Sequence, residues 1–85
     1  MKIHESAENY LETILILQRK NGQVRSIDIA GELSYSKPSV SIAMKNLREN
    51  CYISVDKDGF ITLLEKGKQI AETIYERHTL ISDWL

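Results

Sequence analysis

The chain has 85 residues, 42% of them hydrophobic and 27% charged, with one cysteine and a formal net charge of −1 at pH 7. This length and composition are typical of one soluble globular domain and exclude a low-complexity or disulfide-stapled chain. No basic, apolar leader opens the sequence, and no apolar run approaches the roughly 20 residues that a membrane-spanning helix needs, so we expect no contact with a membrane.

The first predicted helix covers residues 6–21. Ser6 is a suitable N-cap, and the pair Asn21-Gly22 is typical of a helix end. At about 100° per residue, the apolar side chains fall on one broad face. That face comprises Ala7, Tyr10, Leu11, Ile14, Leu15 and Leu17. The opposite edge is polar and mostly acidic, and it carries Glu5, Glu8, Asn9 and Glu12.

A second, shorter helix is predicted over about residues 27–34, with Ser26 as its N-cap. Its buried stripe is expected to be Ile27, Ala30 and Leu33. Residues 34–36, Ser-Tyr-Ser, follow as a tight turn of hydroxyl side chains. Two short helices joined by such a turn are the core of a helix-turn-helix unit.

The third helix is predicted to start after Ser36 as its N-cap. Pro38 falls in the first turn, where its missing N–H costs nothing, and residues 48–50 bring the helix to an end. The buried stripe is Val40, Ala43, Met44 and Leu47. The opposite, outward side carries Pro38, Ser41, Ile42 and Lys45.

Two strand-like runs, 52–55 and 60–64, flank the turn sequence Asp-Lys-Asp-Gly at 56–59, which predicts a hairpin. Cys51 lies between the third helix and this hairpin, where we expect a small buried or half-buried side chain, and a lone cysteine agrees with a reducing cytoplasm. A last helix is predicted from about residue 65 to the end, starting near Leu64. Its inward stripe is Gly67, Ile70, Ala71, Ile74, His78, Ile81 and Leu85.

This order of elements predicts a mainly α fold with a small β-hairpin, the winged helix-turn-helix. The charge distribution favours DNA as its partner, since six basic residues stand against two acidic ones between Arg19 and Arg48. In such a fold the start of the third helix enters the major groove, where small hydroxyls bond base edges or phosphates and apolar groups pack on thymine methyls. Phosphates would be neutralised by Arg25, Lys37, Lys45 and, on the wing, Lys57.

Other interpretations of the same residues stay open. Serines before a proline are ordinary turn and cap residues, and a single exposed isoleucine is common on protein surfaces. A winged helix that binds another protein is the main rival, and an exposed Ile42 suits that function too. An enzyme is the least favoured class, because no nucleophile, base and orienting group share a motif.

His78 lies within the inward stripe of the last helix. A lone inward histidine is more often a hydrogen-bonded core residue than a metal ligand. If the acidic edge of the first helix packs near it, however, one imidazole meets one or two oxygens. Such mixed nitrogen and oxygen sets suit Mn²⁺, Fe²⁺ or Zn²⁺.

Three segments, ESAENYLETILIL, VRSIDIAGELSYSKPSVSIAMKNL and LLEKGKQIAETIYERHTLISDWL, resemble the amino-terminal domain of the diphtheria toxin repressor family. The manganese transport regulators are the most similar branch. The resemblance implies a cytoplasmic, homodimeric repressor that binds operator DNA and is activated by a divalent metal, Mn²⁺ or Fe²⁺. It also implies that Glu12 and His78 are metal ligands. Asn9 takes the place of an aspartate in the manganese branch and of a methionine in the iron branch.

The same resemblance implies that Ser36, Pro38, Ser39 and Ser41 belong to a DNA-facing cluster of serine and proline. Ile42 replaces a glutamine that contacts DNA in one branch, which implies a different base preference. Leu64 replaces a threonine that commonly caps the last helix. Family members continue into a helical domain that dimerises and adds metal ligands, so we expect residues 1–85 to be a fragment with an incomplete metal site.

The leading hypothesis is therefore the DNA-binding domain of a metal-responsive transcriptional repressor. The alternative is a winged helix without metal control, which acts through protein contacts or binds DNA constitutively. Asn9 and the modest net charge favour this alternative.

Overall fold

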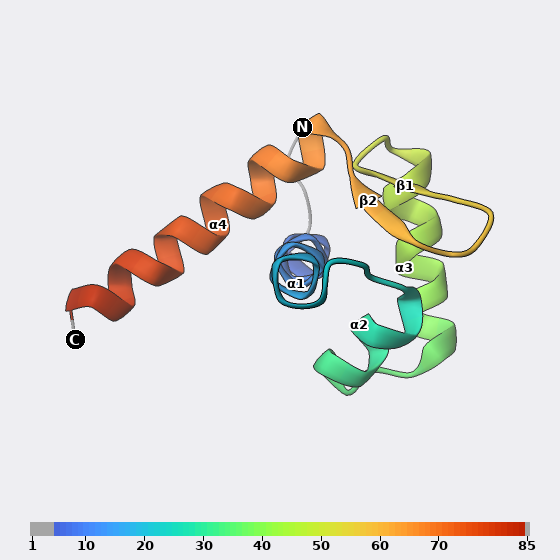
Figure 1. Ribbon diagram of the computed structural model, residues 1–85, viewed down its shortest axis with the longest axis horizontal. Coiled ribbons are helices and arrows are strands. Elements are labelled where there is room, and N and C mark those ends of the chain that lie inside the picture. The colour runs from blue at the N-terminus through green and yellow to red at the C-terminus, as the bar shows by residue number, and fades with distance from the viewer. Residues whose placement is uncertain (1–4, 85) are drawn as a thin grey trace.

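The computed structural model describes the backbone of residues 5–84 and the side chains of residues 6–77. Its elements, in chain order, are α1 (Glu5–Asn21), α2 (Ser26–Leu33), α3 (Lys37–Glu49), β1 (Ile53–Val55), β2 (Ile61–Leu63) and α4 (Glu65–Trp84) (Figure 1). This is the order of a winged helix-turn-helix, and the predicted fold class is confirmed.

Helix α1 lies at the centre of the domain. Figure 1 shows it end-on, with α4 crossing on one side and α2, α3 and the hairpin on the other. The predicted apolar face is buried, and Leu11 and Ile14 are fully inaccessible to solvent. The helix begins at Glu5, one residue earlier than expected, so Ser6 lies inside its first turn and is not its N-cap.

The start of α2 differs from the prediction. Arg25 is the N-cap residue, and its backbone N–H donates to the Asp28 carboxylate at 2.9 Å. Ile27 was expected in the core, yet it is 56% exposed, whereas Ile29 is completely buried. Because the buried Val24 and the Asp28 cap fix where the helix begins and how it is rotated, Ile29 takes the inward position.

The turn between α2 and α3 is short, as predicted. Ser34 adopts the left-handed conformation at φ 58°, and the N–H of Tyr35 donates to the Ala30 carbonyl at 3.1 Å. The Tyr35 ring meets the buried Tyr10 ring edge-on at 5.8 Å, which joins the turn to α1. Burial, and to a lesser extent the neighbouring Tyr35, raises the pKa of the Tyr10 hydroxyl.

Helix α3 ends in a Schellman-type cap. The N–H of Cys51 donates to the Arg48 carbonyl at 3.1 Å, and the N–H of Tyr52 donates to the Leu47 carbonyl at 3.0 Å. Cys51 takes the left-handed position of this cap, at φ 64°, and its side chain is exposed. The expected buried cysteine is therefore wrong, because the turn directs Cys51 to solvent and buries Tyr52 instead.

The hairpin that follows is antiparallel, pairing Ile53 with Leu63 and Val55 with Ile61. Its strands are shorter than predicted. The N–H of Ile61 also donates to the Val24 carbonyl at 2.7 Å, so the loop before α2 is bonded directly to the wing. A two-stranded hairpin is marginally stable alone, and this bond ties it to the rest of the domain.

Helix α4 starts against the beginning of the hairpin. The N–H of Leu64 donates to the Tyr52 carbonyl at 3.0 Å, and Gly67 packs so closely on this carbonyl that a Cβ would overlap it. From there α4 crosses α1, and its C-terminal half extends away from the other elements (Figure 1). In the part of the chain that the structure describes, no helix is long and apolar enough to span a membrane.

Gly67→Ala should lower the free energy of unfolding by about 1–3 kcal/mol, since the added methyl group must push α4 away from the Tyr52 backbone. Gly31→Ala is the matched control, because the space around Gly31 in α2 is open and alanine favours a helix by up to about 1 kcal/mol. Urea denaturation compares the two variants. Equal stability of both would contradict the close packing at Gly67.

Candidate nucleic-acid interface

The N-terminus of α3 is held by two serines. The Ser36 hydroxyl accepts the backbone N–H of Ser39 at 3.3 Å and donates to the Ser39 hydroxyl at 2.8 Å. Pro38 occupies the first turn, as the sequence predicts. Ser36 and Ser39 therefore have a structural task in capping α3, although both side chains are exposed.

The outward face of α3 is made of small, apolar and basic side chains. Val40, Met44 and Leu47 are buried against the rest of the domain. Pro38, Ser41, Ile42 and Lys45 are exposed on the other side. Ile42 is 63% exposed, more than any other large apolar side chain in the described part of the molecule. We call these four residues the α3 outer face.

The four side chains that are predicted to contact DNA phosphates are all exposed to solvent. Lys37 and Lys45 are exposed on α3, and Lys57 is exposed in the turn of the hairpin. Arg25 is exposed just before α2, and its guanidinium lies 4.3 Å from the centre of the Phe60 ring. Within residues 6–77, no carboxylate forms an ion pair with any of these four cations, so their charge is available to an anionic partner.

Arg19 belongs to the same basic stretch of sequence but has a different role. Its guanidinium lies 3.9 Å from the Glu72 carboxylate and 4.9 Å from the centre of the Tyr75 ring, both on α4. These contacts fasten the end of α1 to α4. Arg19 is thus part of the packing between helices and adds little to the charge of the α3 side.

The predicted metal ligands come from α1 and α4. Asn9 is exposed and Glu12 is half-buried, one turn apart on α1. His78 lies in α4, and its side chain is outside the described residues. Among the described side chains, no three His, Cys, Asp or Glu residues gather closely enough to hold a metal ion. The two oxygen donors of Asn9 and Glu12 suit a divalent cation chemically, but two donors do not make a site.

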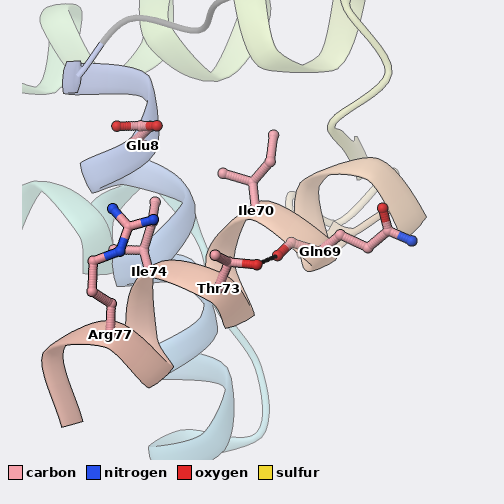
Figure 2. Close-up of a pocket in the computed structure, with 6 residues that line it drawn as sticks. All are labelled: Glu8, Gln69, Ile70, Thr73, Ile74 and Arg77. Atoms are coloured by element: carbon pink, nitrogen blue, oxygen red, sulfur yellow. Dashed lines mark hydrogen bonds between the residues drawn. The ribbon is translucent and has the colours of Figure 1, made fainter. Parts of the chain in front are cut away.

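A pocket of about 230 Å³ lies between α1 and α4 (Figure 2). It is lined by Glu8, Gln69, Ile70, Thr73, Ile74 and Arg77. Figure 2 shows the Arg77 guanidinium directed along the pocket toward the part of α1 that carries Glu8. Arg77, three residues after the inward Ile74, was not among the predicted site residues.

A helix-turn-helix with an exposed second helix, followed by a hydrogen-bonded two-stranded wing, defines the winged-helix fold. Residues 2–60 match the iron dependent repressors, specifically their N-terminal DNA binding domain. The chain belongs to this family, and the resemblance expected from its sequence is confirmed.

A curated relative agrees with this family, and solved structures agree with the fold. The chain is 35% identical over 80 residues to the HTH-type transcriptional regulator MntR of Geobacillus thermodenitrificans, an alignment that covers 94% of the chain and 57% of that protein. A MarR family protein from Bacillus stearothermophilus superposes with a TM-score of 0.74 at 18% identity, covering 100% of this chain and 61% of that one. The MepR–DNA complex of S. aureus gives 0.66 at 27% identity, covering 95% and 65%. The chain thus spans a little over half the length of the MntR relative.

Proposed function

We propose that this chain binds operator DNA with the α3 outer face and serves as the DNA-reading part of a metal-responsive repressor. The observation that carries the proposal is the exposure of Pro38, Ser41, Ile42 and Lys45 on the second helix of the helix-turn-helix. Membership of a DNA-binding domain family supports it.

The α3 outer face suits the floor of a major groove. Ser41 is short enough to let the helix approach closely, and its hydroxyl can donate to or accept from a base edge. Pro38 and Ile42 offer apolar surface, and the thymine methyl group is the apolar feature of that groove. We propose that Ile42 makes the chain prefer thymine where a glutamine would select adenine.

The exposed cations would supply affinity without sequence information. Each lysine or arginine that meets a phosphate releases counterions, which strengthens binding at low salt. Lys45 belongs to the α3 outer face, and Lys37 lies at the start of the same helix, while Arg25 and Lys57 lie toward the wing. Ser36 and Ser39 keep the start of α3 capped, and the Ser39 hydroxyl, which accepts from Ser36, can donate to a phosphate oxygen.

Metal control is proposed through Glu12, Asn9 and His78. Glu12 would contribute a charged oxygen, Asn9 a neutral carbonyl oxygen and His78 an imidazole nitrogen, a set that suits Mn²⁺ or Fe²⁺. A bound divalent cation would offset the acidic edge of α1 and tie α1 to α4. Since α1 also packs against α2, this tie would fix the orientation of the helix-turn-helix.

We propose that two copies of the protein bind operator DNA together, as a homodimer, in the cytoplasm. Helix-turn-helix proteins commonly read two half-sites one helical turn apart, and a pair of recognition helices matches this spacing. The chain spans only 57% of the length of its MntR relative, so the dimer is proposed for the protein in which this domain acts.

A protein-binding winged helix is the second candidate. The exposed Ile42 and the net charge of −1 favour it, because an apolar side chain on a nearly neutral domain suits a protein partner. Salt dependence separates the two candidates. DNA binding weakens steeply with added salt, whereas an apolar protein contact changes little.

Ser41→Glu should weaken DNA binding by about 100-fold or more, since it places a negative charge against the negatively charged groove. Thr73→Glu adds the same charge at an exposed residue of α4, outside the α3 outer face, and should bind as the wild type does. Fluorescence anisotropy at low salt, with duplexes enriched from a random library by the wild-type chain, measures both. Equal affinities for the two variants would refute the assignment of the α3 outer face.

His78→Ala should weaken Mn²⁺ binding by about ten-fold or more, since even the outer hydrogen-bond partners of metal ligands contribute about that much. Glu76→Ala, an exposed residue of the same helix, is the matched control and should leave Mn²⁺ affinity unchanged. Isothermal titration calorimetry reports the affinity, and circular dichroism checks that both variants stay helical. Undiminished Mn²⁺ affinity in His78→Ala would remove His78 from the site.

A further inference from the structure

The net charge of the turn of the wing does not favour contact with a phosphate. Lys57 stands between Asp56 and Asp58, so the turn carries one positive and two negative charges. The Asp56 carboxylate accepts the backbone N–H groups of Asp58 and Phe60, each at 2.9 Å, but these bonds leave its negative charge in place. A phosphate approaching Lys57 would therefore meet a net negative turn.

The base of the wing offers a different cation. The Arg25 guanidinium lies 4.3 Å from the centre of the Phe60 ring, within the range of a cation–π contact. Arg25 is exposed, while Phe60 is half-buried. A guanidinium stacked on a ring keeps the N–H groups at its rim free to donate, and paired N–H donors match the oxygens of a phosphate.

Both partners of this stack are fixed through their backbones. The N–H of Phe60 donates to the Asp56 carboxylate, and the Phe60 carbonyl accepts the Asp56 N–H at 3.1 Å. On the other side, the N–H of Arg25 donates to the Asp28 carboxylate. The Val24 carbonyl, one residue earlier, accepts the N–H of Ile61 at 2.7 Å. The ring and the start of α2 are thus held in one frame.

We propose that Phe60 is a positioning residue that holds Arg25 ready to bind a DNA phosphate, and that this contact contributes more to binding than Lys57 in the turn of the wing. The proposal rests on the proposed function of DNA binding. It adds that the Arg25 guanidinium is the group on the wing side that contacts the phosphodiester backbone. Holding the long arginine side chain in place before binding reduces the conformational entropy lost on contact.

The test measures binding of a mixed-sequence DNA duplex by fluorescence anisotropy over a series of salt concentrations. Phe60→Leu keeps an apolar side chain but removes the ring, and should weaken binding about 2–5-fold. Phe60→Tyr keeps the ring face and should bind as the wild type does. Arg25→Gln should reduce the slope of log affinity against log salt by about 0.9, and Lys57→Gln should change it much less.

A double substitution separates positioning from folding. If Phe60 acts through Arg25, Phe60→Leu has no further effect in the Arg25→Gln chain. In the wild type the ring should also shift the NMR signals of the Arg25 side chain upfield, and Phe60→Leu should abolish that shift without DNA present.

The outcomes distinguish the two proposals. A wild-type chain that fails to bind the duplex at low salt refutes the proposed function. Binding that is unaffected by Phe60→Leu, or weakened equally with and without Arg25, refutes the positioning role alone. A larger loss of salt slope in Lys57→Gln than in Arg25→Gln would assign the phosphate contact to the turn.

Discussion

The burial of one face of α1 is the interaction on which the arrangement of the domain depends. Helices α2 and α4 and strand β2 all pack against α1, and Leu11 and Ile14 on this face are fully buried. Each such side chain contributes about 1.5–3 kcal/mol when removed from water, which is large beside the roughly 5–15 kcal/mol that stabilises a whole domain. Any change in how α4 sits on α1 is therefore felt by the helix-turn-helix, and this gives the proposed metal control a mechanical basis.

The wing is joined to the helix-turn-helix by the burial of Ile53, Ile61 and Leu63 in the core and by contacts at its base. The bond from Ile61 to Val24 joins strand β2 to the loop before α2, and the stack of Arg25 on Phe60 covers the same junction. Two strands of three residues each have little stability of their own. The wing thus keeps a defined place beside α3 because its strands are buried in the core and its base is bonded to the loop before α2.

The sequence predicted the elements whose apolar pattern is long and regular. The burial of Val40, Met44 and Leu47 on α3 followed from helical spacing, and so did the exposure of Ile42 opposite them. In the eight-residue α2 the same reasoning chose Ile27 over Ile29, because a short helix with apolar residues on several sides does not define its own rotation. The packing of the buried Val24 set the rotation of α2 and so placed Ile29 in the core.

Other features depend on contacts between distant parts of the chain and had no local signal. The left-handed turn at Cys51 carries no glycine to mark it, and the stack of Arg25 on Phe60 joins residues far apart in sequence. The α3 outer face could be predicted as an exposed surface with suitable chemistry, whereas the DNA bases it prefers depend on the complex. The predicted metal ligand His78 has its side chain outside the described residues, so its role stays a prediction.

The most direct measurement is an NMR titration of the ¹⁵N-labelled chain with a DNA duplex enriched by the protein. DNA bound by the α3 outer face predicts amide shifts concentrated in residues 36–45 and around Arg25, with α4 beyond Gly67 almost unchanged. Shifts concentrated along α4 and the exposed edge of α1, with α3 unaffected, would contradict the account.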